Sequence, residues 1–316
     1  MRALHVPAAG EQPTLADIPT PEPTEGTVLV RVKAAGLNPI DNAVAAGFLT
    51  QMGMPHAYPV VIGRDAAGVV EAVGAGVDHV AVGDEVLGHV LMAPPISAGT
   101  LAEYALLPAV AVTAKPAGLD FTKAAALPLA GAAAVQSIEA IDPQPGQTVL
   151  VNGASGGVGS FAVQLLAARG VTVVATGKPA DAERLTALGA ARVIDHTAGP
   201  VAEQVRAAYP DGVDALLSLH GMDPSTTPIA AVRSGGKVAG VAAVPDEATL
   251  AAAGLTGTSV MATPTRDVLA PLAQQAATGD LTVPVADVLT LDQAHEGLGR
   301  LATGGAGGKL VVTVQD

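Results

Sequence analysis

The stretch Thr148-Val-Leu-Val-Asn-Gly-Ala-Ser-Gly-Gly-Val-Gly159 decides how the rest of the chain is interpreted. Its apolar run favours a β-strand, and residues 160–169 after its glycine cluster favour a helix. Gly153, Gly156 and Gly159 recur every three residues. A turn of this kind lets the backbone approach a diphosphate and directs helix N–H groups at it. Such turns also occur without a ligand, so the surrounding sequence has to decide.

Strands and helices are expected to alternate after this stretch. Strand-forming segments at Val171–Thr176, Arg192–Asp195, Val213–Ser218 and Lys237–Val241 are separated by helix-forming segments such as Pro179–Gly189. This alternation predicts an α/β fold with a doubly wound parallel sheet of the Rossmann type.

The N-terminal part of the chain is β-rich by strand and turn signals instead. Thr27–Lys33, Ala67–Gly74 and Val80–Leu87 predict short strands separated by glycine turns, and Pro39–Ala46 predicts one short helix. This spacing is typical of a small antiparallel β-barrel.

The C-terminal part is predicted to contain two helices and three short strands. Helices are expected near Val268–Ala277 and at Asp292–Ala302, and strands at Leu281–Val285 and Val288–Leu291. The last strand, Lys309–Val314, is expected to return to the N-terminal domain.

Composition limits the function classes. A net charge of −13 argues against nucleic acid as a partner, because phosphate backbones attract clustered Lys and Arg. The chain has no cysteine, so disulfides and Cys-ligated zinc are impossible. No apolar run reaches the ~20 residues of a membrane span. Pro7 interrupts the N-terminus too soon for a signal peptide, and a cytoplasmic protein is expected.

The end of the second parallel strand predicts which dinucleotide binds. NAD-preferring sites place an Asp or Glu about 20 residues after the glycines, where it binds the ribose hydroxyls. Here that place holds Thr176, Gly177 and Lys178. A carboxylate would repel a 2′-phosphate, whereas a lysine and a hydroxyl can hold one, so NADPH is expected rather than NADH. The nearby Asp181 complicates this assignment, and Lys178 as a solvated surface lysine is the alternative.

Further cofactor contacts are expected from the glycine-rich turn and from the ends of later strands. His196 follows the third strand and Ser218 ends the fourth, although both also suit ordinary loop positions. The predicted cofactor-binding residues are Gly153, Ser155, Gly156, Gly157, Val158, Gly159, Thr176, Gly177, Lys178, His196, Ser218, Gly240 and Val241.

Motifs for other chemistries do not occur in the sequence. The seven histidines form no His-Glu-x-x-His or other close ligand pair, so no metal site is predicted. There is no Gly-x-Ser-x-Gly elbow of a hydrolase, and the glycine-rich turn lacks the Gly-Lys-Ser/Thr ending of a P-loop. Hydride transfer remains, in which the cofactor carries the chemistry and the protein orients it.

Short signatures follow one another along nearly the whole chain. They are Ala34–Asp41, Pro59–Val70, Val82–Val86, Gly99–Tyr104, Ala124–Pro128, the glycines of 153–159, Asp292–Glu296 and Gly308–Val312. In this order they resemble the zinc-free medium-chain dehydrogenases/reductases, in the quinone oxidoreductase-like (zeta-crystallin-like) branch.

The resemblance implies a GroES-like β-barrel catalytic domain made of residues 1–120 and 268–316. A Rossmann domain, residues 121–267, is then inserted between the two parts, and the active site lies in the interdomain cleft. Zinc-dependent relatives carry Gly-His-Glu where this chain has Gly63-Arg64-Asp65. The resemblance also implies a homodimer.

Asn38 and Asp41 are the catalytic candidates that the resemblance places near the nicotinamide. The alternative for both is backbone capping around Pro39, since Asn and Asp favour such turns.

The sequence therefore predicts a zinc-independent, NADPH-dependent oxidoreductase that delivers hydride to a quinone or another α,β-unsaturated carbonyl. Its partner would be a small electron-poor carbonyl substrate, and neither a nucleic acid nor a membrane is expected as a partner. Water can supply the proton of the reduction. Two alternatives stay open: a pathway-specific enone or enoyl reductase of the same superfamily, and a non-catalytic NADPH-binding sensor or partner protein.

Overall fold

The chain divides into two compact units. The computed structural model describes residues 1–304 and 306–315, so Gly305 and Asp316 lie outside the described residues. The first unit consists of residues 1–132 together with the segment from Thr263 to the C-terminus, and the second unit consists of residues 133–262. The functional domain boundaries expected at 120/121 and 267/268 stay predictions.

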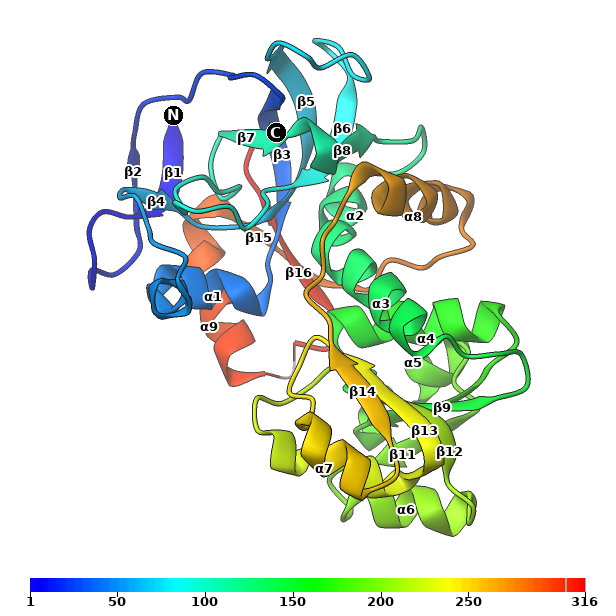
Figure 1. Cartoon of the computed structure of the whole chain (residues 1–316). Helices are drawn as coiled ribbons and strands as arrows, with labels where there is room; N and C mark the ends of the chain where they lie inside the picture. The colour runs from blue at the N-terminus through cyan, green and yellow to red at the C-terminus, as the bar shows by residue number, and fades with distance from the viewer. Residues whose placement is uncertain (305, 316) are drawn as a thin grey trace. The chain divides into compact units, whose positions relative to one another are not determined.

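A six-stranded sheet forms the centre of the second unit (Figure 1). Its strands, in spatial order, are β11 (Arg192–Asp195), β10 (Thr172–Gly177), β9 (Thr148–Asn152), β12 (Val213–Ser218), β13 (Val232–Gly240) and β14 (Thr256–Ser259). Every neighbouring pair is parallel. The strand order reverses at β9, which is the arrangement of a doubly wound Rossmann sheet. The predicted α/β fold is confirmed.

One row of apolar side chains shows how this sheet is packed. Leu150 lies in register with Val174 on one side and with Leu216 on the other, and Leu216 is in turn in register with Val238. All four are at most 1% exposed and belong to one core cluster. Parallel strands buried on both faces need such runs of branched apolar residues.

Five helices accompany the strands of this sheet in the sequence. They are α3 (Pro128–Ile141), α4 (Gly157–Ala168), α5 (Ala182–Ala187), α6 (Val201–Ala208) and α7 (Glu247–Ala252). Proline is favoured at the first position of a helix, as in α3, because its missing N–H has no intrahelical partner there.

The first unit contains two sheets. The larger has the order β15 (Val285–Thr290), β16 (Lys309–Thr313), β3 (Thr27–Gly36), β5 (Asp65–Val73), β6 (Glu85–His89) and β8 (Val112–Ala114), with β7 (Tyr104–Pro108) also paired to β3. The smaller has the order β2 (Thr14–Asp17), β1 (Arg2–Val6) and β4 (Val60–Val61). The helices of this unit are α1 (Pro39–Ala45), α2 (Phe121–Ala126), α8 (Arg266–Thr278) and α9 (Ala294–Thr303).

The C-terminal strand returns to the N-terminal part of the chain, as predicted. β16 runs antiparallel to β3, with Val312 opposite Ala35, and Figure 1 shows the red strand beside the blue one. The two ends of the chain therefore build one sheet, and they bring Lys309 close to the end of β3.

Two predicted strands are wrong in their extent. Of the predicted strand Val80–Leu87, only the end is a strand, since β6 begins at Glu85. The residues before it form a turn, in which the Ala81 N–H donates to Asp84 Oδ2 at 2.8 Å. At Leu281–Val285, β15 begins only at Val285. Leu281 is 2% exposed, so its apolar character serves packing, and Pro284 has no N–H to offer a neighbouring strand.

In the parts of the chain that the structure describes, no helix combines the length and the apolar character that crossing a membrane requires.

Candidate functional site

The glycine turn, residues 153–159, connects β9 to α4 in the second unit. Gly153 has a φ of 92°, a left-handed conformation that favours glycine. A Cβ on Gly159 would lie 2.2 Å from the Gly153 carbonyl oxygen, so the turn packs directly against the backbone of α4. Gly156 is the N-cap of this twelve-residue helix. The turn thus has the bare backbone and the free helix N–H groups that an anion such as a diphosphate requires.

Thr176, at the end of β10, fixes the first residue of the glycine turn. The Gly153 N–H donates to Thr176 Oγ1 at 2.8 Å, and Thr176 is only 2% exposed. The hydroxyl that the sequence assigns to the 2′-phosphate is therefore engaged by the turn itself. Its direct cofactor contact stays a prediction. A Cβ added at Gly177 beside it would lie 2.7 Å from Leu185 Cδ1, so the Leu185 side chain would have to shift.

Lys178 is exposed, and the acidic neighbour that complicated its assignment is paired. Asp181 Oδ2 accepts the Lys178 backbone N–H at 3.2 Å, and Asp181 Oδ1 accepts Arg184 Nη2 at 3.2 Å. A carboxylate already paired with a guanidinium repels a nearby phosphate less than a free one does. This arrangement leaves the Lys178 ammonium available to an anion at the end of β10.

Arg184 is a residue that sequence analysis missed. From α5 its Nη1 donates to Ser160 Oγ and its Nη2 to the Ser155 carbonyl oxygen, both at 3.1 Å. It therefore ties the glycine turn and α4 to the helix after β10. The spacing of Asp181 and Arg184, three residues apart, could have indicated the ion pair, but nothing local indicates that Arg184 contacts the turn.

The remaining predicted cofactor residues follow the parallel strands, whose carboxyl ends meet at one edge of a sheet. Ser218 ends β12 opposite Asn152 of β9 and is fully buried, with its Oγ donating to the Ala243 carbonyl oxygen at 2.9 Å. Gly240 ends β13, and a Cβ there would lie 1.9 Å from the Ser218 carbonyl oxygen. Val241 is 37% exposed and His196 is exposed after β11. Their contacts with a cofactor stay predictions.

Asn38, the N-cap of α1, belongs to a buried polar network in the first unit. It is 4% exposed, and its Nδ2 donates to Asp65 Oδ2 at 2.8 Å. Its Oδ1 accepts from Lys309 Nζ at 2.6 Å. The side-chain amide is therefore used within the protein on both its oxygen and its nitrogen. Such an amide can position its neighbours. A catalytic role of Asn38 stays a prediction.

Asp65 is the centre of this network, which the sequence did not predict. His89 Nδ1 donates to its Oδ1 at 2.7 Å, the Leu129 N–H donates to the same oxygen at 3.1 Å, and Lys309 Nζ lies 3.5 Å from its Oδ2. Burial alone would raise the pKa of Asp65, but the His89 hydrogen bond and the Lys309 charge outweigh it and lower that pKa. Asp65 is therefore a buried carboxylate anion with a cation beside it.

Asp41 lies close to this network, but its pKa is shifted in the opposite direction from that of Asp65. It is fully buried, and desolvation raises its pKa to about 7 although the Asn38 N–H and the Arg64 charge oppose the rise. Its Oδ2 accepts the Asn38 backbone N–H at 2.7 Å, which is the capping role given above as the alternative. Its Oδ1 has no hydrogen-bond partner among residues 1–304 and 306–315.

Arg64 stands where zinc-dependent relatives carry histidine, and it is 1% exposed. Its Nη1 donates to the Ala98 carbonyl oxygen at 3.1 Å. In the described chain no group of three or more His, Cys, Asp or Glu side chains is placed to hold a metal ion.

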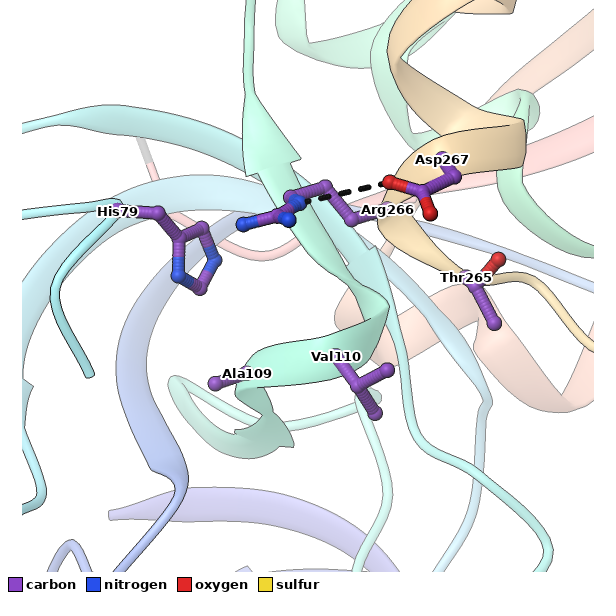
Figure 2. Close-up of a pocket in the computed structure, with 6 residues that line it drawn as sticks. All are labelled: His79, Ala109, Val110, Thr265, Arg266 and Asp267. Atoms are coloured by element: carbon purple, nitrogen blue, oxygen red, sulfur yellow. Dashed lines mark ion pairs between the residues drawn. The ribbon is translucent and has the colours of Figure 1, made fainter. Parts of the chain in front are cut away.

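A pocket of about 280 Å³ in the first unit lies apart from these residues. Its lining residues are His79, Ala109, Val110, Thr265, Arg266 and Asp267 (Figure 2). Figure 2 shows the Arg266 side chain extending from α8 toward His79, while its Nε lies 3.8 Å from Asp267. None of these lining residues belongs to the glycine turn or to the Asp65 network.

Two family models match the chain. The alcohol dehydrogenase GroES-like domain matches residues 24–117, and the zinc-binding dehydrogenase model matches residues 157–266. The first falls in the first unit, and the second falls mainly in the second unit and begins at Gly157, within the glycine turn.

Curated relatives share part of the sequence. A mitochondrial NAD(P)H oxidoreductase of Mus musculus is 36% identical over 57% of this chain and 48% of its own length. The NADPH-dependent alkenal/one oxidoreductase of Arabidopsis chloroplasts is 34% identical over 71% of this chain and 57% of its own length. The chain spans about half the length of the curated relatives it matches.

Solved structures match over the full length. The quinone oxidoreductase of Coxiella burnetii has a TM-score of 0.88 and 28% identity, covering 100% of this chain and 99% of that one. An NAD-dependent alcohol dehydrogenase has a TM-score of 0.86 and 30% identity with 100% of both chains covered. A mycobacterial protein solved in complex with NADPH has a TM-score of 0.85 and 28% identity, with 99% of each chain covered.

The sheet order, the glycine turn and these matches agree with one another, and the chain belongs to the medium-chain dehydrogenase/reductase superfamily, in its quinone oxidoreductase-like branch.

Proposed function

We propose that this protein is an NADPH-dependent oxidoreductase that reduces a small electron-poor carbonyl compound, a quinone or an enone. The observation that carries the proposal is the glycine turn. Hydrogen bonds join it to Thr176 of β10 and to Arg184 of α5. The names of the relatives agree with it, since one acts on alkenals and alkenones with NADPH and a structural neighbour is a quinone oxidoreductase.

NADPH fits the second unit. The backbone N–H groups of the glycine turn would hold its diphosphate, because the turn presents no side chain bulk at Gly153 and Gly159. Lys178 would hold the 2′-phosphate, and Arg184 pairs with the neighbouring carboxylate of Asp181. His196, Ser218, Gly240 and Val241 are proposed as further contacts at the same sheet edge. When bound, the cofactor supplies the hydride.

The first unit would orient the substrate without a metal. We assign Asn38 and Asp41 to positioning of the loop between β3 and α1, since Asn38 is engaged with Lys309 and Asp65 and Asp41 caps the Asn38 backbone. The proton that accompanies hydride transfer then comes from water, because general acids need access to the reacting atom and these two side chains are buried.

A cytoplasmic homodimer is part of the proposal. The dimer rests on family resemblance, and light scattering of the purified chain measures it: a mass near 62 kDa, twice the 31.0 kDa of the chain, is expected, and a mass of one chain contradicts it.

The activity is tested with a panel of quinones and enones by following NADPH consumption. Turnover of at least one class with NADPH is expected. Turnover of the same compound with NADH should be at least about tenfold slower. Tight NADPH binding without turnover across the panel would support a non-catalytic sensor instead. Turnover with NADH alone would contradict the assignment of Lys178.

A further inference from the structure

His220 lies beside the glycine turn, in the loop that follows β12. β9 and β12 are neighbouring parallel strands, and Ser218 at the end of β12 is in register with Asn152 at the end of β9. A Cβ added at Gly153 would lie 2.8 Å from His220 Cβ and 3.2 Å from the His220 backbone nitrogen. The stem of the His220 side chain therefore lies directly against the first residue of the turn.

The backbone on both sides of His220 is held in place by hydrogen bonds. The Leu219 N–H donates to the Asn152 carbonyl oxygen at 2.9 Å, and the Ala243 N–H donates to the Gly221 carbonyl oxygen at 3.1 Å. The residue before His220 is thus joined to β9, and the residue after it is joined to the segment that follows β13. A group fixed in this way before a ligand arrives loses less freedom when the ligand binds.

The imidazole of His220 is available to a ligand. The residue is exposed, and within residues 1–304 and 306–315 its ring makes no hydrogen bond or ion pair. A neutral imidazole offers one N–H donor, and a protonated one offers two donors together with a positive charge. Both forms can donate to a phosphate oxygen, and the bond to a charged acceptor is the stronger kind of hydrogen bond.

The strand order places His220 and Lys178 on opposite sides of the glycine turn. β10, which ends just before Lys178, lies on one side of β9, and β12, which precedes His220, lies on the other. Dinucleotides bind across an open α/β sheet at the point where its strand order reverses, which here is β9. A diphosphate on the turn therefore has Lys178 toward one side of the sheet and His220 toward the other.

We propose that His220 is a further cofactor-binding residue, whose imidazole donates a hydrogen bond to the diphosphate held on the glycine turn. The inference rests on the proposed binding of NADPH, and it adds a side-chain donor to a site otherwise made of backbone N–H groups. Because NADPH and NADH share the diphosphate, His220 strengthens the binding of both cofactors equally, whereas Lys178 acts on NADPH alone.

Fluorescence titration of the whole chain with NADPH and with NADH tests the proposal in two variants. His220→Phe keeps an aromatic ring but has no donor, so both dissociation constants are expected to rise at least about tenfold. His220→Arg keeps N–H donors, so both constants should stay within about threefold of those of the unchanged protein. Unchanged affinity in His220→Phe would overturn the proposal. A loss in His220→Arg as large as in His220→Phe would also overturn it, because any change at this position would then weaken binding.

Arg192→Met is the control in the same unit. Arg192 is exposed at the amino end of β11, away from the carboxyl edge of the sheet, so this variant should bind both cofactors as the unchanged protein does. The titrations also separate this inference from the proposed function. An unchanged protein that binds neither cofactor would overturn both, whereas cofactor binding that His220→Phe leaves intact would overturn the role of His220 alone.

Discussion

Lys309 and Asp65 form a buried ion pair that joins distant parts of the chain. Lys309 is 4% exposed and also donates from Nζ to the Leu37 carbonyl oxygen at 2.9 Å, so its ammonium is shared by β16, the end of β3 and β5. Burial lowers the pKa of Lys309, and the charges of Asp65 and Asp41 oppose this. Burial disfavours each charge by itself, and the opposite charge of the partner offsets this, so both groups stay ionised.

Lys309→Met should destabilise the protein by about 3–5 kcal/mol, because it leaves the Asp65 carboxylate buried without its cation. Chemical denaturation measures the free energy of unfolding. Lys123→Met is the matched control, since Lys123 pairs with Asp120 at an exposed site and such pairs contribute at most about 1 kcal/mol. Similar losses in the two variants would contradict the network.

The Asp41 carboxyl should make stability depend on pH. Its pKa is raised from 3.8 to about 7, so the folded protein holds a proton that the unfolded chain has released between these values. Stability from this group is therefore present at low pH and is lost as pH rises toward and through 7. Asp41→Asn removes the effect. Relative to that variant, the unchanged protein should lose about 2–3 kcal/mol between about pH 5 and pH 8; a constant difference would show that Asp41 does not titrate there.

At the scale of elements, the glycine turn is held by both neighbouring segments rather than by its own glycines alone. Thr176 of β10 accepts its first N–H, and Arg184 of α5 binds the Ser155 carbonyl oxygen and Ser160 of α4. The turn is therefore preorganised, and less of its freedom has to be lost when a cofactor binds.

Gly159→Ala should destabilise the second unit, whereas Gly156→Ala should be tolerated. An added Cβ at Gly159 would lie 2.2 Å from the Gly153 oxygen, which is backbone and cannot yield, but at Gly156 the same oxygen is 3.5 Å away. We expect a loss of about 1–3 kcal/mol for Gly159→Ala and less than about 1 kcal/mol for Gly156→Ala. Thermal denaturation compares them, and equal stabilities would mean that the turn does not pack as described.

Lys178 and Arg184 are expected to affect cofactor binding differently. Lys178→Met should weaken NADPH about 10–100-fold and leave NADH unchanged, because only the 2′-phosphate contact is lost. Arg184→Met should weaken both cofactors, because it loosens the glycine turn that both use. Fluorescence titration gives the four dissociation constants. A parallel loss of NADPH and NADH affinity in Lys178→Met would assign that lysine to the turn instead.

For the whole molecule, the pattern of strands and helices could be predicted from the sequence, whereas side-chain contacts between distant residues could not. The alternation after Thr148 predicted the parallel sheet, and the pattern at Lys309–Val314 predicted a strand returning to the N-terminal part. The network around Asp65 was missed because Lys309 and Asn38 are 271 residues apart, and only the pairing of β16 with β3 brings them together. Arg184 was missed for the same reason, since it contacts Ser155 across 29 residues.

The central claim, hydride delivery from NADPH to a conjugated carbonyl, is tested most directly by isotope transfer. The protein is incubated with an enone that it consumes and with NADPH that carries deuterium at the transferred position, and the product is analysed by mass spectrometry and NMR. One deuterium at the β-carbon of the saturated ketone, with the proton at the α-carbon taken from water, is the predicted result. A product without deuterium, or NADPH that binds and is not consumed with any enone or quinone, would contradict the account.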